Sequence, residues 1–269
     1  MLWELGGEHL VWCGDSLNYG PDGETEEVMV VTDPPYGVDM ERVIKEKLRS
    51  ARNRTHRYEC NDFEYNRQVF ADKEVPNLSA VFGRWDPRVV YCFAASSRLP
   101  EFYAHFESAG IVIRSLLLWV KTNHAFGWSH YKRKHESLLY GTKKGMPAKW
   151  VGGHKQTTIL THPSIQGKKR IHCCQKPVEL LMTLIGNHDI KTVVDPFMGS
   201  GSCLIAADKC GRRFIGGDLD RRHVDNAIAW WVREREAAGK DSSVVCLEAE
   251  DERLDGRQGD AAAGNGRTI

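Results

Sequence analysis

The sequence predicts an α/β fold built on a mostly parallel sheet, with helices on both faces and an antiparallel hairpin at one edge. Short apolar runs rich in β-branched residues, typical of buried strands, alternate with stretches of helical spacing. Several of these runs end abruptly in Asp, Gly or Pro, as strands do where they deliver a loop. At 269 residues the chain is long enough for one large domain, which we expect to cover residues 1–246.

The first half of the chain supplies most of the predicted strands. The apolar runs predict strands at 9–13, 28–31, 88–93, 111–120 and 137–140. The last two are expected to pair as the antiparallel edge hairpin, and Gly141 is expected to end the second. Residues 100–109 have helical spacing with Gly110 as the stop. Residues 37–76 are polar, basic and poorly periodic, which predicts a mobile insertion.

The second half contains the clearest supersecondary unit. After a basic, loop-like stretch, Lys176-Pro177 is expected to open a helix, with proline near its first turn, where it is tolerated. A strand at 192–194, a Gly-rich turn, a small-residue helix and a second strand ending at Asp218 then follow the order of a nucleoside-binding crossover. Another helix begins at Arg221, and residues 247–269 are expected to form a flexible tail.

Charge is distributed unevenly along a chain whose formal net charge is only +1. Residues 121–176 contain twelve lysines and arginines against one acid, Glu136, and residues 42–57 are similarly basic. Such local fields attract polyanions. The eight cysteines form no Cys-x-x-Cys pair, so no metal site is expected. Neither a signal segment nor an apolar stretch long enough to span a membrane is evident, so a cytoplasmic protein with no membrane partner is expected.

The turn Asp195-Pro196-Phe197-Met198-Gly199-Ser200-Gly201 has the composition of a ligand-binding loop. Gly199 and Gly201 let a ligand approach the main chain closely, and the following helix offers free N–H groups to a carboxylate. Asp218 is placed to accept hydrogen bonds from two ribose hydroxyls. Because no lysine follows Gly201, the turn favours a nucleoside carrying a carboxylate over a pyrophosphate.

Asp33-Pro34-Pro35-Tyr36 follows directly on a buried strand and forms a stiff, extended loop. An exocyclic amine on an aromatic base is a poor nucleophile, because its lone pair is delocalised into the ring. The Asp33 carboxylate and the Pro34 carbonyl could hold the two amine hydrogens and draw the nitrogen towards tetrahedral geometry. The Tyr36 ring could stack on the base, which is worth about 1–3 kcal/mol for nucleic-acid bases.

Together the two motifs resemble those of the S-adenosylmethionine-dependent DNA amino-methyltransferases, which act on adenine N6 or cytosine N4. The order, with Asp33–Tyr36 first and the Gly-rich turn later, is similar to the beta arrangement of that family. The likeness covers roughly residues 9–235. It implies a Rossmann-like methyltransferase fold, S-adenosylmethionine as cofactor and double-stranded DNA with a flipped target base as substrate. The sequence leaves open whether the chain acts alone or as a homodimer.

The resemblance assigns roles to individual residues. The catalytic loop would be Asp33, Pro34, Pro35 and Tyr36. The cofactor site would be formed by Asp195, Phe197, Gly199, Gly201 and Asp218, with Asp15 at the adenine end and Lys176 near the methionine portion. Because residues 119–123 and 135–136 match the segment on the target-base side, we expect DNA to be bound by Lys121, Asn123, Lys132, Arg133 and Lys134.

Two departures from the family pattern stand out. Asp218 stands where the family commonly has glutamate, which keeps the carboxylate and shortens its reach. The stretch between Tyr140 and His172 is too short for the recognition domain of many relatives. Residues 141–171 are therefore expected to form a short, basic target-recognition region, unless the 37–76 insertion carries specificity.

Several alternatives remain beside adenine methylation. Carbon-5 cytosine methylation requires a Pro-Cys thiolate, and no Pro-Cys occurs in the chain. Methylation of the cytosine amine uses the same chemistry as that of adenine, but relatives acting on cytosine more often have serine in place of Asp33. Enzymes that modify protein glutamine tend to have Asn-Pro-Pro-Tyr, and RNA remains a candidate substrate. The chain could also be a nucleic-acid-binding module without catalysis, but the intact Asp33–Tyr36 loop and the intact Gly199/Gly201 turn argue against this.

Overall fold

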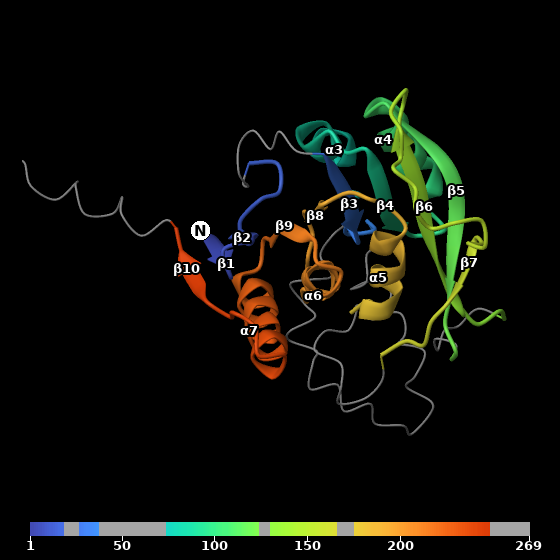
Figure 1. Ribbon diagram of the computed structural model, residues 1–269. Coiled ribbons are helices and arrows are strands. Elements are labelled where there is room, and N and C mark those ends of the chain that lie inside the picture. Colours follow the sequence, from blue (N-terminus) through green and yellow to red (C-terminus); the bar gives the residue numbers. More distant parts are fainter. Residues whose placement is uncertain (19–26, 38–73, 124–129, 166–174, 248–269) are drawn as a thin grey trace, which may run out of the picture.

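The computed structural model describes residues 1–18, 27–37, 74–123, 130–165 and 175–247, and these form one ten-stranded sheet with helices on both faces (Figure 1). The strands are β1 (Leu2–Leu5), β2 (His9–Cys13), β3 (Val28–Thr32), β4 (Val89–Ala94), β5 (Ile111–Val120), β6 (His135–Lys143), β7 (Ile159–Thr161), β8 (Thr192–Asp195), β9 (Arg213–Asp218) and β10 (Val244–Cys246). The helices are α3 (Leu78–Trp85), α4 (Leu99–Ser108), α5 (Val178–Gly186), α6 (Ser202–Lys209) and α7 (Arg221–Ala237).

The sheet has the order β10-β1-β2-β9-β8-β3-β4-β6-β5-β7. Its centre, from β2 through β9, β8 and β3 to β4, is parallel throughout. Strand β6 runs antiparallel to both β4 and β5, so β5 runs in the same direction as the central strands. The carboxyl ends of β2, β3, β4, β5, β8 and β9 therefore all lie at one edge. Strand order reverses between β8 and β3, where open α/β sheets bind ligands.

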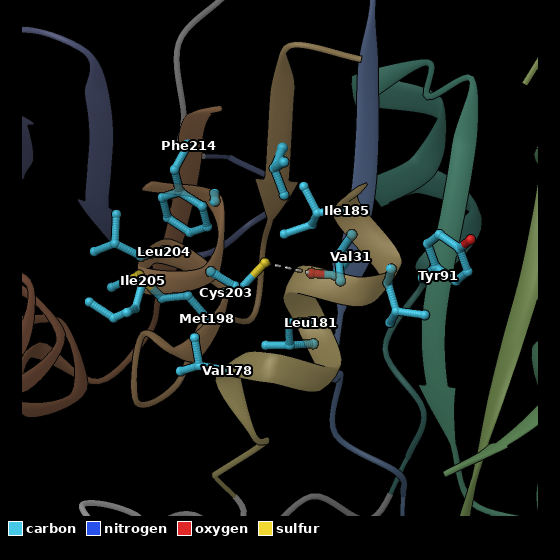
Figure 2. Packing of buried hydrophobic residues seen from close by; sticks show 14 of the residues in the cluster. Val31, Tyr91, Val178, Leu181, Ile185, Met198, Cys203, Leu204, Ile205 and Phe214 are labelled. Carbon is cyan, nitrogen blue, oxygen red and sulfur yellow. Dashed lines mark hydrogen bonds between the residues drawn. The ribbon is translucent and has the colours of Figure 1, made fainter. Parts of the chain in front are cut away.

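Alternation along β3 explains how the sheet is covered on both sides. Met29 and Val31 belong to a core that includes α5, α6 and α7, whereas Val28 and Val30 belong to a second core with α3 and α4. In Figure 2, apolar side chains of α5 and α6 pack against the strands, and the Cys203 thiol donates to the Val31 carbonyl at 3.4 Å. Because both faces are buried, β3 is apolar almost throughout.

The predicted α/β class and mostly parallel sheet are confirmed, with several corrections. The β5–β6 hairpin is not at the edge, because β7 pairs with β5 beyond it. At the other edge β1 and β10 add antiparallel pairs that were not predicted, and α3 was also missed. Gly141 does not end β6. A side chain there would lie 2.7 Å from Ile111 and 2.9 Å from the Phe106 ring, so glycine lets the strand pass beneath α4.

Two of the predicted mobile segments fall largely outside the described residues. They are the insertion at 37–76, of which 38–73 is not described, and the tail at 247–269, of which only Leu247 is described. Across the described part of the chain, no helix is long and apolar enough to cross a membrane.

A buried ionic cluster fastens α7 to α6 and β2. The Asp208 carboxylate lies 2.7 Å from Arg235 Nη1 and 3.5 Å from His9 Nε2. The Phe214 N–H donates to His9 Nδ1 at 3.1 Å, so the ring proton of neutral His9 must be on Nε2, facing Asp208. Arg235 also donates to the Asp241 carbonyl at 2.7 Å. Loss of Asp208 would therefore leave a buried guanidinium without its counter-ion.

Replacing Asp208 by alanine should lower the free energy of unfolding by about 3–5 kcal/mol, the usual cost of breaking a buried pair. Urea unfolding followed by circular dichroism measures it. Asp189→Ala is the matched control: this carboxylate is 71% exposed and 3.7 Å from Arg212, and its loss should change stability by no more than about 0.5 kcal/mol. Equal small losses in both variants would contradict a structural role for the cluster.

Candidate functional site

The carboxyl edge of the parallel strands brings together the two motifs singled out in the sequence (Figure 1). Asp33 follows β3, and Asp195 ends the adjacent strand β8. Asp218 ends β9 and lies in register with Cys13 of β2, so that Asp15 comes next to it, where Gly14 N–H donates to the Asp218 carbonyl at 3.0 Å. Parallel strand direction alone thus gathers residues from four separate segments.

Asp195 is buried and holds the turn from below. Its Oδ1 accepts a hydrogen bond from Thr32 Oγ1 at 2.7 Å and another from the Phe197 N–H at 3.2 Å. Burial raises the pKa of Asp195 to about 7, although these two donors oppose the rise. The side chain therefore ties β8 to β3 and fixes the start of the Gly-rich turn.

The two glycines of the turn have different constraints. Both have positive φ, 49° at Gly199 and 84° at Gly201. A Cβ on Gly201 would lie 2.6 Å from the Cβ of Ala227, so this glycine lets α7 pack against the start of α6. A Cβ on Gly199 would meet nothing closer than the Phe197 carbonyl at 4.0 Å, so the turn is open on that side. The main chain is thus accessible to a ligand at Gly199.

Asp218 is oriented by three donors from the chain itself. Its Oδ2 accepts from the Gly199 N–H at 3.1 Å, and its Oδ1 accepts from the Asp220 N–H at 2.8 Å and lies 3.1 Å from Nδ1 of buried His223. Burial lowers the pKa of His223, but the hydrogen bond and charge of Asp218 outweigh it, so that the pKa is raised. Since a carboxylate oxygen accepts about two hydrogen bonds, Oδ2 keeps capacity for a ligand hydroxyl.

Asp15 and Phe197 flank this turn. Asp15 is exposed and accepts from the Leu17 N–H at 3.0 Å and from Asn18 Nδ2 at 3.2 Å, which holds its carboxylate at the start of the loop. Phe197 is half-buried and packs against the core under α3 and α4. All the predicted cofactor residues except Lys176 therefore lie on or beside the ends of β2, β8 and β9.

The Asp33–Tyr36 loop carries a partly buried carboxylate. The Tyr36 hydroxyl donates to Asp33 Oδ1, and the Lys176 ammonium forms an ion pair with Oδ2. Burial raises the pKa of Asp33, Lys176 opposes the rise, and Glu136 adds to it. The loop ends at Gly37, which has a φ of 63°. A Cβ at this position would lie 2.8 Å from the main chain of Glu74, so both the backbone conformation and the close packing favour glycine. The loop presents a fixed acceptor rather than a free carboxylate.

Lys176 lies at Asp33, although the sequence grouped it with the cofactor residues. Its buried ammonium is also 3.4 Å from Glu136 Oε2 and 4.7 Å from the centre of the Phe93 ring. Glu136 in turn pairs with Lys121. Sequence reasoning placed Glu136 in the segment on the target-base side without giving it a role of its own, and it assigned no role to Phe93. The available signal was that Glu136 is the one acid in the basic segment 121–176.

The predicted DNA-binding residues lie on the connection between β5 and β6. The strands pair up to Val120 and His135, and the Lys121 N–H donates to the Lys134 carbonyl at 2.8 Å. Because β5 runs with the central strands, this connection emerges at the same edge as Asp33. Its predicted DNA contacts are exposed except for the half-buried Lys121: Asn123, Lys132, Arg133 and Lys134.

Comparison with known proteins places these features in a family. The family model described as DNA methylase matches residues 28–229. YubD of Escherichia coli (strain K12) is 34% identical over 133 residues, which are 47% of this chain and 54% of YubD. The type II methyltransferase M.BglII of Bacillus subtilis is 23% identical over 260 residues, covering 82% of this chain and 68% of that protein. The match thus spans only about half of YubD.

Solved structures share the fold. The M1.HpyAVI–SAM complex has a TM-score of 0.56 at 19% identity, over 82% of this chain and 98% of that one. PvuII DNA methyltransferase, described as cytosine-N4-specific, has a TM-score of 0.58 at 13% identity, over 82% of this chain and 85% of its own. These structures confirm the predicted Rossmann-like arrangement.

The raised pKa of Asp195 predicts a pH-dependent stability. Between the ordinary pKa of 3.8 and about 7, the folded chain holds a proton that the unfolded chain has lost, so stability should fall as pH rises through this window. The slope should reach up to about 1.4 kcal/mol per pH unit. Asp195→Asn keeps the acceptor oxygen and removes the titration. Its urea stability, measured from pH 4.5 to 8, should lack this slope, and parallel curves for the two proteins would refute the prediction.

Proposed function

The chain belongs to the DNA methylase family, and on that premise we propose that it transfers a methyl group from S-adenosylmethionine to the exocyclic amine of adenine at specific sites in DNA. The observation that carries the proposal is the Thr32–Asp195 hydrogen bond, which holds the Asp33 loop and the Gly-rich turn at one strand-end edge. A methyl donor on the turn and an amine at Asp33 would then be neighbours.

The chemistry of the turn fits the cofactor. The open main chain at Gly199 and the remaining acceptor capacity of Asp218 Oδ2 suit a nucleoside, with Asp15 beside them for the adenine end. When bound, S-adenosylmethionine supplies the sulfonium methyl group that the amine takes up. The free N–H groups at the start of α6 would face its carboxylate. Phe197 would provide an apolar wall beside the turn.

The Asp33 loop would act on the amine. Its carboxylate and the Pro34 carbonyl would accept the two amine hydrogens, which concentrates the lone pair on nitrogen and leaves it facing the methyl group. Pro35 would keep the loop extended. Tyr36 would contribute in two ways, because its hydroxyl orients Asp33 and its ring is available for stacking. No residue is required to form a covalent bond to the base.

Adenine is proposed over cytosine because the loop begins with Asp33. The cytosine amine remains the second candidate, and the fold shared with the cytosine-N4-specific PvuII enzyme is compatible with either base. Incubation of the protein with labelled cofactor and duplex DNA, followed by nucleoside mass spectrometry, separates the outcomes. N6-methyl-2′-deoxyadenosine supports the proposal, N4-methyl-2′-deoxycytidine would replace it with the second candidate, and transfer of no methyl group would indicate a binding module.

DNA recognition is proposed to involve the β5–β6 connection, because its basic residues share the edge with Asp33. The target base would leave the helix to reach the strand ends, at a cost of a few kcal/mol that stacking on Tyr36 would partly offset. The basic side chains would contact phosphates and set orientation, while sequence is read elsewhere. The short region 141–171 is the proposed place for that reading.

Asp33→Ala should reduce methyl transfer at least about 100-fold, in the range seen when a positioned proton-handling group is lost, and leave the dissociation constant for S-adenosylmethionine nearly unchanged. Filter-binding assays of tritiated methyl incorporation and calorimetry measure the two quantities. Asp225→Ala on α7, an exposed carboxylate paired with Arg221, is the control and should retain activity. Parallel loss of transfer and cofactor affinity would reject the role given to Asp33.

Neutralising Lys132, Arg133 and Lys134 with glutamine should weaken DNA binding and flatten its salt dependence. For every phosphate that the protein no longer neutralises, the slope of log K against log salt falls by about 0.9. The control replaces three exposed charges at the opposite edge, Lys191, Arg233 and Lys240, with glutamine. Fluorescence anisotropy between 50 and 250 mM salt is the measurement. If both triple variants keep the wild-type slope, the β5–β6 connection does not bind DNA phosphates.

A further inference from the structure

Four alternating charges connect the Asp33 loop to the β5–β6 edge. Asp33 pairs with Lys176, Lys176 with Glu136 at 3.4 Å, and Glu136 with Lys121. They come from four segments: the loop after β3, the approach to α5, the start of β6 and the end of β5. This row of four charged side chains extends from the proposed catalytic loop to the proposed DNA contact.

Lys176 is the most buried of these four charged residues, with its side chain 8% exposed. Its ammonium lies 4.7 Å from the centre of the Phe93 ring, a cation–π distance, on the floor formed by β4. Burying an ammonium is costly unless it is paired. Here two carboxylates and an aromatic face surround it, so its position is set from three sides.

Asp33 needs such a partner because of where it stands. It is faced by Lys176, Glu136 and the Tyr36 hydroxyl, and at longer range by Asp195. Burial and the Glu136 carboxylate favour its protonated form, and a protonated carboxyl is a poorer acceptor for an amine hydrogen. Lys176 is the cation in direct contact with it. Pro177, directly after Lys176, begins the cap of α5 and fixes the main chain there.

We propose that Lys176 is a positioning residue, which holds the Asp33 carboxylate charged and turned so that Oδ1 faces the amine, with Glu136 keeping Lys176 in place. This rests on the proposed function for its catalytic consequence. The claim that Lys176 controls the ionisation of Asp33 does not depend on that function, because it can be tested without any substrate. The proposal also separates Lys176 from the cofactor site, where sequence resemblance had put it.

The test compares Lys176→Met, which removes the charge, with Lys176→Arg, which keeps it. Carboxyl carbon NMR of aspartate-labelled protein, with the Asp33 signal assigned through Asp33→Asn, reports the titration of Asp33 directly. In Lys176→Met the Asp33 midpoint should rise by at least about one pH unit, and in Lys176→Arg it should stay near that of the wild type. Lys209→Met removes an ion-paired lysine on α6 and should leave the midpoint unchanged.

Activity gives a second readout. The acid limb of kcat against pH should move upward in Lys176→Met by the same amount as the NMR midpoint, so the rate on that limb falls roughly tenfold per unit. The dissociation constant for S-adenosylmethionine should change less than about threefold. A large loss of cofactor affinity with an unmoved Asp33 midpoint would overturn the proposal and return Lys176 to the cofactor site.

The proposal remains testable if methyl transfer is absent or if the Lys176→Met variant does not fold. If wild-type protein transfers no methyl group to DNA, the proposed function fails, while the NMR comparison still decides whether Lys176 controls Asp33. If Lys176→Met does not fold, Lys176→Gln, which is neutral and keeps a hydrogen-bond donor, takes its place. An unmoved midpoint in that folded variant refutes the positioning role.

Discussion

The buried hydrogen bond from Thr32 Oγ1 to Asp195 Oδ1 joins residues 163 positions apart, at the point where the strand order reverses. On one side of it the chain leaves β3 as the Asp33 loop, and on the other it leaves β8 as the Gly-rich turn. Asp195 Oδ1 also accepts from the Phe197 N–H, so the same oxygen positions the start of both loops. The two loops to which the proposed function assigns the two reactants thus share one side chain.

Around this bond, the edge holds three carboxylates, Asp33, Asp195 and Asp218, each managed differently. Asp195 is buried beneath the turn, where burial favours its protonated form. Asp218 is held by two main-chain N–H groups and by His223. Asp33 is paired with an ammonium. Three residues of the same type therefore have different surroundings, and such differences between ionisable groups are common at functional sites.

Much of the fold was predictable because its central strands are unmistakable in sequence. The runs that became β2, β3, β8 and β9 are apolar, short and closed by Asp or Gly, and nothing competes with a buried-strand interpretation. Strand β10 could not be found this way, because its three residues are all exposed and depend on pairing with β1. Gly141 was misplaced as a terminator since its true constraint, the Phe106 ring, comes from a helix distant in sequence.

The site shows the same division. The loop and turn were evident from motif chemistry, and parallel strands then had to bring them to one edge. The Lys176–Asp33 pair joins residues 143 positions apart, and no local pattern encodes it. Only the packing of α5 against the sheet brings the approach to that helix over Phe93 and towards Asp33.

Why lysine should fill this position follows from the acceptor capacity of Asp33. A guanidinium would tend to take both carboxylate oxygens in a bidentate fork, which competes with an incoming amine hydrogen. An ammonium is a point charge that bonds Oδ2 alone, and the Tyr36 hydroxyl takes only one site on Oδ1. On the proposed function, Oδ1 would therefore remain able to accept from the amine, while Lys176 favours the ionised form of the carboxylate. A buried acceptor for a weak nucleophile has to meet both conditions, and a single lysine meets them together.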